Sequence, residues 1–154
     1  MSEEADSRRN PERPVVGVGG VVWRGNEFLL VRRGKEPNKG QWSIPGGAQH
    51  LGETVFAAGE REVREETGLR VKVLALVDVV DGIHRADSGA VDWHYTLVDL
   101  VAESPSGEAR AADDAEEVAW FSLAQLSGLG LWNETERVIR QSASIRDASS
   151  VLLQ

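Results

Sequence analysis

The chain has 154 residues, a length that suits one domain with a single hydrophobic core. Its net charge of −8 argues against a general nucleic-acid binder, which normally presents a basic face. The absence of cysteine excludes disulfides and thiolate metal ligands and fits a cytoplasmic protein, and no apolar run approaches the roughly 20 residues of a membrane span.

The N-terminal third predicts a leader followed by a β-hairpin. Residues 1–13 are polar, charged and interrupted by proline, so we expect a disordered leader before a single domain over residues 14–154. Residues 15–23 are apolar and β-branched, and Gly25-Asn26 supplies a two-residue turn into a second strand at 27–33. This strand ends in Arg32 and Arg33, which are either surface charge or fork-like contacts to phosphate.

Three glutamates lie close together on the next predicted element. Residues 42–47 are too rich in Pro and Gly for a helix, whereas residues from 53 onward favour one that stops at Gly68. At about 100° per residue, Glu62, Glu65 and Glu66 share about one third of the helix circumference. Like charges at this spacing repel one another, and a hard cation such as Mg2+ would bind their oxygens. The alternative interpretation is a solvated acidic face.

The rest of the chain predicts an α/β protein with a mixed sheet and helices packed on it. Residues 71–80 predict a strand with alternate apolar residues on one face, broken at Asp81-Gly82 before a polar loop at 83–90. Residues 91–101 predict a strand with Trp93, Tyr95 and Leu97 on one side. An acidic stretch at 111–117, a short strand at 118–121, a helical stretch beginning at 123–126 and a final helix at 131–145 follow.

The stretch from Gly47 to Leu69 resembles the Nudix box, G-x5-E-x7-R-E-U-x-E-E-x-G-U, where U is a bulky aliphatic residue. All the defined positions are filled, by Gly47, Glu53, Arg61, Glu62, Val63, Glu65, Glu66, Gly68 and Leu69. So many matches at fixed spacing make the pattern specific. The resemblance implies the α/β/α sandwich of that family and a hydrolase for nucleoside diphosphates linked to another group.

The same resemblance implies roles for individual residues. Glu62, Glu65 and Glu66 would hold Mg2+, with Mn2+ as an alternative, and one of them or an acid from another loop would deprotonate water. Arg61 and Glu53 would support these acids by fixing their rotamers, and with Glu62 and Glu65 they form the expected catalytic set.

Residues outside the acidic helix complete the expected site. Gly46 would direct its carbonyl oxygen at the metal, and both Gly46 and Gly47 would let the backbone approach the helix. Asp114 would bring an additional carboxylate to the metal, and the alternative is that residues 113–117 form a solvated turn. His50 stands where many family members carry Glu, and Gly59 lies in mid-helix, where Ala would be better by about 1 kcal/mol.

A looser resemblance concerns the substrate. Residues 29–33, 40–47, 94–98 and 113–115 are similar to small bacterial ADP-ribose pyrophosphatases, which implies ADP-ribose or a similar sugar nucleotide. The expected substrate contacts are Arg32, Arg33, Trp42, Gly47 and His94. Trp42, Trp93, Tyr95 and Trp132 are either stacking partners for adenine or ordinary core residues.

Two other functions stay open at this point. The chain could clear modified nucleoside triphosphates from the nucleotide pool, or it could be a non-catalytic domain that senses a nucleotide. The intact set of three glutamates opposes the sensor, because a silent domain has no need of crowded charge. We expect a small-molecule nucleoside diphosphate as partner, with no nucleic acid and no membrane, and a homodimer is left open.

Overall fold

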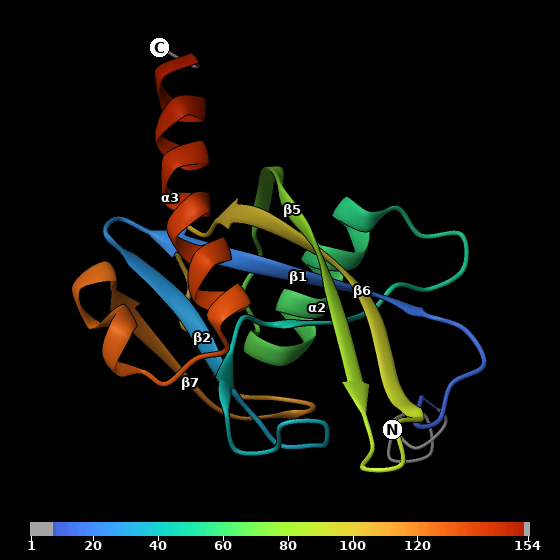
Figure 1. The fold of residues 1–154 in the computed structure, drawn as a ribbon. Coiled ribbons are helices and arrows are strands. Elements are labelled where there is room, and N and C mark those ends of the chain that lie inside the picture. The colour runs from blue at the N-terminus through green and yellow to red at the C-terminus, as the bar shows by residue number, and fades with distance from the viewer. Residues whose placement is uncertain (1–7, 153–154) are drawn as a thin grey trace.

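The computed structural model describes residues 8–152, which form a seven-stranded sheet with helices on both faces (Figure 1). The sheet order is β3-β2-β1-β6-β5, with β4 pairing β1 and β7 pairing β2. The elements in chain order are β1 (Val15–Arg24), β2 (Glu27–Arg33), β3 (Trp42–Ser43), β4 (Gly46–Ala48), α2 (Val55–Thr67), β5 (Lys72–Arg85), β6 (Val91–Glu103), β7 (Ala115–Ser122), the 3-10 helix η1 (Leu123–Gly128) and α3 (Asn133–Leu152).

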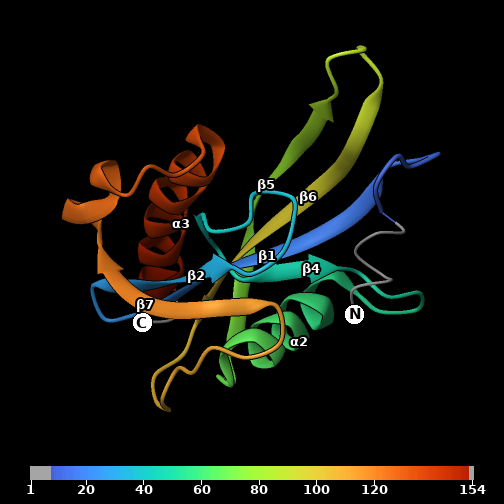
Figure 2. The same ribbon diagram turned by 90° about the horizontal axis from the view of Figure 1, so that it is seen from below.

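The predicted mixed sheet and α/β/α sandwich are confirmed. Strands β1 and β6 are parallel, whereas the other strand pairs are antiparallel. Helices α2 and α3 lie on opposite faces of the sheet (Figure 2). Successive residues of a strand point to opposite faces, so β1 contributes to both cores. Val21 packs in the core that contains Val138 and Ile139 of α3, and Val22 packs with Val63 of α2.

Local signals in the N-terminal half predicted the first hairpin and the helix that ends at Gly68. The hairpin turns at Gly25-Asn26, where Gly25 has a φ of 56° and Arg24 pairs with Glu27. Helix α2 begins after Thr54, whose hydroxyl accepts a hydrogen bond from the Ala57 N–H. It ends at Gly68, which adopts a left-handed φ of 75° and donates its N–H to the Arg64 carbonyl.

The predicted break at Asp81-Gly82 is wrong. Strand β5 continues to Arg85, because residues 81–84 pair one by one with the facing residues of β6. Alternate residues of this strand were predicted to share one apolar face. At the end of the strand this prediction is also wrong, because Val79 is half exposed and Val80 is buried. Register shifts between Val73 and Ala75 and between Leu76 and Asp78 change the alternation of the strand.

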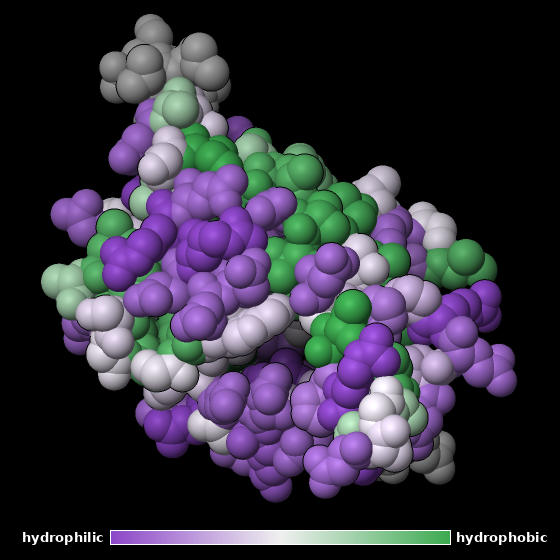
Figure 3. Space-filling model, in the orientation of Figure 1, coloured by the Kyte–Doolittle hydropathy of each residue, from purple (hydrophilic) through white to green (hydrophobic). Residues whose placement is uncertain are grey.

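Other boundaries differ from the prediction in extent. Strands β3 and β4 lie in the Pro- and Gly-rich segment for which no strand was predicted. Strand β7 is longer than the predicted strand at 118–121 because it pairs along β2, and α3 extends beyond residue 145. Apolar side chains also gather on the surface beside α3 (Figure 3). No helix among residues 8–152 is long and apolar enough to cross a membrane.

Residues 1–7 of the predicted leader lie outside the described residues. Its remainder, residues 8–13, forms turns and bends, and the Asn10 N–H donates to the Asp92 carbonyl at 2.7 Å.

Packing explains why Gly59 lies in mid-helix. A Cβ atom at this buried position would come within 2.7 Å of Leu100 Cδ1, in a leucine that is itself fully buried.

We therefore predict that Gly59→Ala lowers the free energy of unfolding by about 1 kcal/mol, because overpacking outweighs the gain in helix propensity. Urea denaturation would measure this change. In a Leu100→Val background, which removes the obstructing methyl group, the same substitution should be neutral or stabilising. If Gly59→Ala stabilises the otherwise unchanged protein, the close contact does not explain the glycine.

Candidate active site

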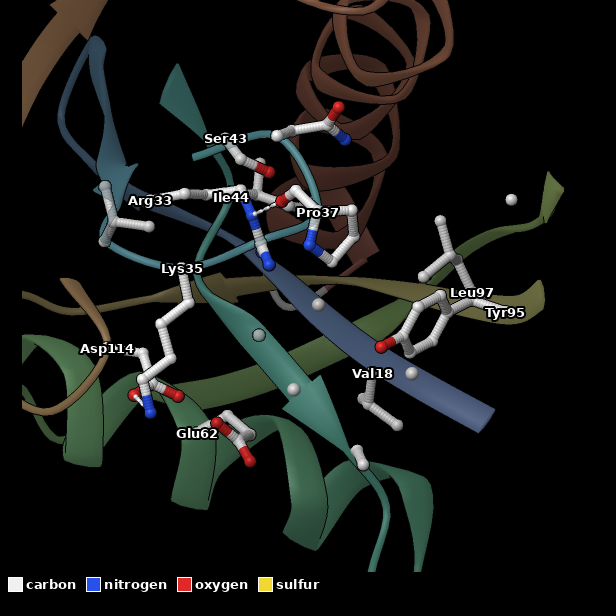
Figure 4. Close-up of a pocket in the computed structure, with 18 of the residues that line it drawn as sticks. Val18, Arg33, Lys35, Pro37, Ser43, Ile44, Glu62, Tyr95, Leu97 and Asp114 are labelled. Atoms are coloured by element: carbon white, nitrogen blue, oxygen red, sulfur yellow. Dashed lines mark hydrogen bonds and ion pairs between the residues drawn. The ribbon is translucent and has the colours of Figure 1, made fainter. Parts of the chain in front are cut away.

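A cavity of about 1000 Å³ opens beside the sheet, between α2 and the start of α3. Its walls come from β1, β4, β5, β6, the segments that flank β3, and the loop before β7. Figure 3 shows a hollow among polar side chains, and Figure 4 shows residues from these elements converging on one space. The volume is that of a site for a small-molecule ligand.

The three glutamates of α2 line this cavity at one end. Glu62 and Glu66 are buried, whereas the side chain of Glu65 is 41% exposed. The helix is held in place by Val63 and Ala58, which pack into the core beneath it. The fold therefore brings the predicted acids to the cavity and removes two of them from bulk water.

Arg61 holds this acidic cluster together. Its Nε and Nη2 donate to Glu53 at 2.7 and 3.0 Å, and its Nη1 donates to Glu62 at 2.8 Å and to Glu65 at 3.1 Å. Nη2 also donates to the Ala48 carbonyl at 3.0 Å, which ties α2 to β4. The hydrogen bond from Arg61 lowers the pKa of Glu53 to about 2, with help from a backbone N–H at His50. These contacts have the geometry of a support for the acids.

Two glycines allow the backbone to approach the glutamates. A Cβ atom at Gly47 would lie 2.5 Å from the Glu62 carboxyl carbon, and one at Gly46 would lie 2.5 Å from the Val18 carbonyl oxygen. The Gly46 backbone also forms a hydrogen bond to Glu66 that favours the ionised carboxylate. A side chain at Gly47 would therefore push β4 away from α2, and one at Gly46 would push β4 away from β1.

The buried acids are electrostatically costly without a cation. Burial, and then the neighbouring Glu62, raise the pKa of Glu66 to about 8, while Arg33 opposes the rise. Burial also raises the pKa of Glu62, against the opposing effect of Arg61. Among residues 8–152, no group of three carboxylate or imidazole side chains is arranged to bind a metal ion. Glu62 and Glu65 both accept hydrogen bonds from Arg61 instead. The oxygen donors nevertheless fit a hard divalent cation whose remaining ligands are water and phosphate oxygens.

The acidic loop before β7 reaches the same end of the cavity. Asp113 and Asp114 both line it. The loop is anchored through its backbone, because the Ala112 N–H donates to the Glu66 carbonyl at 2.9 Å and the Gly34 N–H donates to the Asp114 carbonyl at 2.9 Å. Lys35 Nζ lies 2.9 Å from Asp114 Oδ1. Figure 4 shows the two side chains next to each other.

Arg33 and Lys35 supply positive charge to the cavity wall, whereas Arg32 does not. Arg33 is fixed by a hydrogen bond from its Nε to the Pro37 carbonyl at 2.7 Å. Arg32 lies away from the cavity, 4.8 Å from the ring centre of Trp42 and 3.2 Å from a Glu117 oxygen. Adjacent residues of a strand point to opposite faces, so only one of the two arginines reaches the site.

Two other expected substrate contacts, Trp42 and His94, do not line the cavity. Trp42 packs edge-on against Phe121, with ring centroids 5.3 Å apart, and does not line the cavity. His94 also lies off the cavity, because the alternate residues of β6 face it instead; these are Trp93, Tyr95, Leu97 and Asp99. Gly47 and Trp132 do line the cavity, as does His50, whose N–H donates to Glu53 Oε1 at 3.1 Å.

Sequence reasoning missed Lys35, Asp113 and Asp99 as cavity residues. Asp99 carried a usable signal, since a single acid interrupts the apolar run Leu97-Val98-Asp99-Leu100-Val101. A polar residue in a predicted buried strand is more informative than an apolar one. Lys35 carried no such signal, because it lies in a loop that already contains other charged residues.

The raised pKa of Glu66 predicts how stability depends on pH. This carboxyl ionises near 4.5 in an unfolded chain and near 8 in the folded one, so the folded protein holds more protons between these values. In the presence of chelator, stability should therefore fall as the pH rises from about 5 to about 8. Saturating divalent cation should reduce the fall, because it favours the ionised carboxylates. Thermal unfolding midpoints across this range would measure both effects.

Glu66→Gln should make the pH profile less steep, with Asp99, whose pKa burial raises to about 7, contributing to the remaining fall. Glu60→Gln, at an exposed position of the same helix, should leave the profile unchanged. Equal slopes for the Glu66→Gln variant and the unmodified protein would show that Glu66 is not the group responsible.

Known proteins share both the motif and the fold. The NUDIX domain model matches residues 13–142. An ADP-ribose pyrophosphatase from Methanocaldococcus jannaschii is 37% identical over 127 residues, which cover 82% of this chain and 72% of that protein. A Mycobacterium tuberculosis protein, provisionally named 8-oxo-dGTP diphosphatase 2, is 36% identical over 110 residues, covering 71% and 74% of the two chains. The crystal structure of a MutT Nudix hydrolase from Burkholderia pseudomallei has a TM-score of 0.73 at 33% identity, over 84% of this chain and 98% of that one. The chain belongs to the Nudix hydrolase family.

Proposed function

We propose that this Nudix hydrolase cleaves the diphosphate bond of ADP-ribose or a similar sugar nucleotide with the help of Mg2+. The observation that carries the proposal is the charge arrangement of the cavity. Carboxylates from α2 and the acidic loop line it together with the cationic Arg33 and Lys35. A site for a diphosphate needs carboxylates that bind metal ions as well as cationic side chains. The metal ions and the cationic side chains together offset the negative charge of the diphosphate. The name of the Methanocaldococcus jannaschii relative supports ADP-ribose as the substrate.

The residues of this chain would divide the chemistry as follows. Glu62, Glu65 and Glu66 would hold Mg2+, which when bound lowers the pKa of a water molecule and neutralises phosphate charge. Arg61 keeps Glu62 and Glu65 in position, and the Gly46 backbone does the same for Glu66. A carboxylate of this set takes the proton from water. The new bond joins the water oxygen to phosphorus, and the bond from phosphorus to the bridging oxygen breaks.

The opposite end of the cavity suits the nucleoside. Tyr95 and Leu97 project into it from β6 (Figure 4), and Trp132, which directly precedes α3, lines the same cavity. Trp132 is 46% exposed, so a base stacking on it would bury apolar surface that is now in water.

A second function is favoured by one observation. The Mycobacterium tuberculosis relative is named for the hydrolysis of an oxidised nucleoside triphosphate, at an identity similar to that of the ADP-ribose relative. The two reactions differ in their products. ADP-ribose gives AMP and ribose phosphate, whereas a nucleoside triphosphate gives a nucleoside monophosphate and pyrophosphate.

The test is a substrate panel with product identification. ADP-ribose, other sugar nucleotides and modified nucleoside triphosphates are incubated with the protein in Mg2+, in chelator, and in chelator followed by excess Mg2+. We expect ADP-ribose to give the highest kcat/KM and turnover to disappear and return with the metal. Glu66→Gln should reduce kcat by about 100-fold or more, and the exposed Glu60→Gln should not. Preferred hydrolysis of a triphosphate to pyrophosphate would favour the second function, and full activity in chelator would refute the metal requirement.

The acidic loop gives a separate prediction about the metal site. We expect Asp114→Asn to lower kcat by about 10-fold or more, as loss of a metal ligand or water-positioning group should. Glu117→Gln is the matched control, because Glu117 belongs to the same acidic stretch but pairs with Arg32 away from the cavity. Steady-state kinetics over a Mg2+ titration would compare the two variants. An Asp114→Asn protein with unchanged kcat and Mg2+ dependence would make the loop a solvated turn.

A further inference from the structure

A carboxyl group without a hydrogen-bond partner lies in the cavity wall, on a strand rather than on the acidic helix. Asp99 of β6 is only 7% exposed, yet it lines the cavity. Within residues 8–152, no hydrogen bond to its carboxyl oxygens is found, and these oxygens are not among the fully buried atoms without a partner, so they reach the cavity. A buried polar group is normally paired, so this carboxyl has unused capacity for a ligand.

The surroundings of Asp99 are mostly apolar. A Cβ atom added to Gly19, its register partner on β1, would lie 3.0 Å from Asp99 Oδ1 and 2.9 Å from Ile44 Cδ1. Leu97 and Leu131 line the same cavity. The absence of a side chain at Gly19 therefore keeps the carboxyl accessible between Ile44 and the sheet.

The charged groups that act on Asp99 come from β5 and α3. Asp78, its register partner on β5, and Arg137 of α3 pair with each other at 2.8 Å, and Arg137 also binds Glu134. The facing residue on β1 is glycine and has no charge. Burial, and then Asp78, raise the pKa of Asp99 to about 7, while Arg137 opposes the rise. The carboxyl group is therefore available in both its neutral and its ionised form near neutral pH.

We propose that Asp99 is the specificity-determining residue of a purine-base subsite, where its carboxyl group hydrogen-bonds the amino-bearing edge of adenine. A neutral carboxyl group offers one donor and one acceptor. Adenine presents the complementary pair, an N6 amino donor beside the N1 acceptor. Guanine presents two donors on the corresponding edge, which match an ionised carboxylate instead. The choice of adenine rests on the proposed function, in which ADP-ribose is the substrate.

Two substitutions separate this role from a merely structural one. Asp99→Asn keeps one donor and one acceptor, so it should bind adenine as the neutral carboxyl does. Asp99→Leu has a similar size and offers neither. At pH 7 we expect Asp99→Leu to raise the KM for ADP-ribose by about 10-fold or more, with kcat changed by less than about 3-fold. Asp99→Asn should keep KM close to that of the unmodified protein.

The pH dependence of KM is the second readout. As the pH rises from about 6 to about 8.5, the KM of the unmodified protein should increase relative to that of Asp99→Asn, because ionisation removes the donor to N1. The ratio of the two values cancels the titration of the acids on α2, which both proteins share. Thermal unfolding of Asp99→Leu serves as the folding control, and its midpoint should be equal or higher because the substitution removes a desolvated carboxyl group.

Calorimetric titration with AMP and with GMP makes the test independent of turnover. An affinity for AMP that falls about 10-fold or more in Asp99→Leu and persists in Asp99→Asn supports the subsite, even if ADP-ribose is not hydrolysed; in that case the proposed function alone fails. Unchanged AMP affinity and unchanged KM in Asp99→Leu would overturn the inference while leaving the proposed function intact. Preference for GMP, or no binding of either nucleotide, would overturn it as well.

Discussion

The acidic end of the cavity depends on one guanidinium group. Arg61 donates hydrogen bonds to the carboxylates of Glu53, Glu62 and Glu65 and to one carbonyl oxygen. Its positive charge therefore offsets part of the repulsion among the glutamates that crowd about one turn of α2. The carbonyl belongs to Ala48, so the same group joins α2 to β4 and fixes the distance between the helix and the glycine backbone. The protein itself therefore holds Glu53, Glu62 and Glu65 together through Arg61.

The cavity joins two chemically different environments through the central strands. One end presents acids from α2 together with Arg33 and Lys35, which suits the polar, charged part of a substrate. The rest of the cavity presents apolar and aromatic side chains from β6 and from the segment before α3, and the carboxyl of Asp99 also lines it. Because β1 and β6 lie between α2 and α3, a rigid sheet sets the spacing between the two ends.

Local signals predicted the elements that local chemistry decides. The capping of α2, its end at Gly68 and the first hairpin follow from residues close in sequence, and the spacing of the glutamates along α2 placed them on one side. The course of β5 was not predictable in this way, because its register shifts arise from pairing with β6. For the same reason the sequence left Arg32 and Arg33 equivalent, and only the pairing of β2 with β3 and β7 decides which one reaches the cavity. Asp99 was overlooked because only His94 and the aromatic residues of its strand were considered as site residues.

The attachment of the acidic loop has a consequence for the divergence of related enzymes. Main-chain hydrogen bonds from Arg110, Ala112 and Gly34 hold the loop against α2 and β2, so its path does not depend on which side chains it carries. Asp113 adopts a left-handed φ of 52°, which favours Asp, Asn or Gly at that point, whereas its neighbour Asp114 is under no such backbone restriction. Mutation at residue 114 can therefore exchange a carboxylate for another functional group without rebuilding the scaffold. Loops of this kind let one fold acquire new substrates by single substitutions.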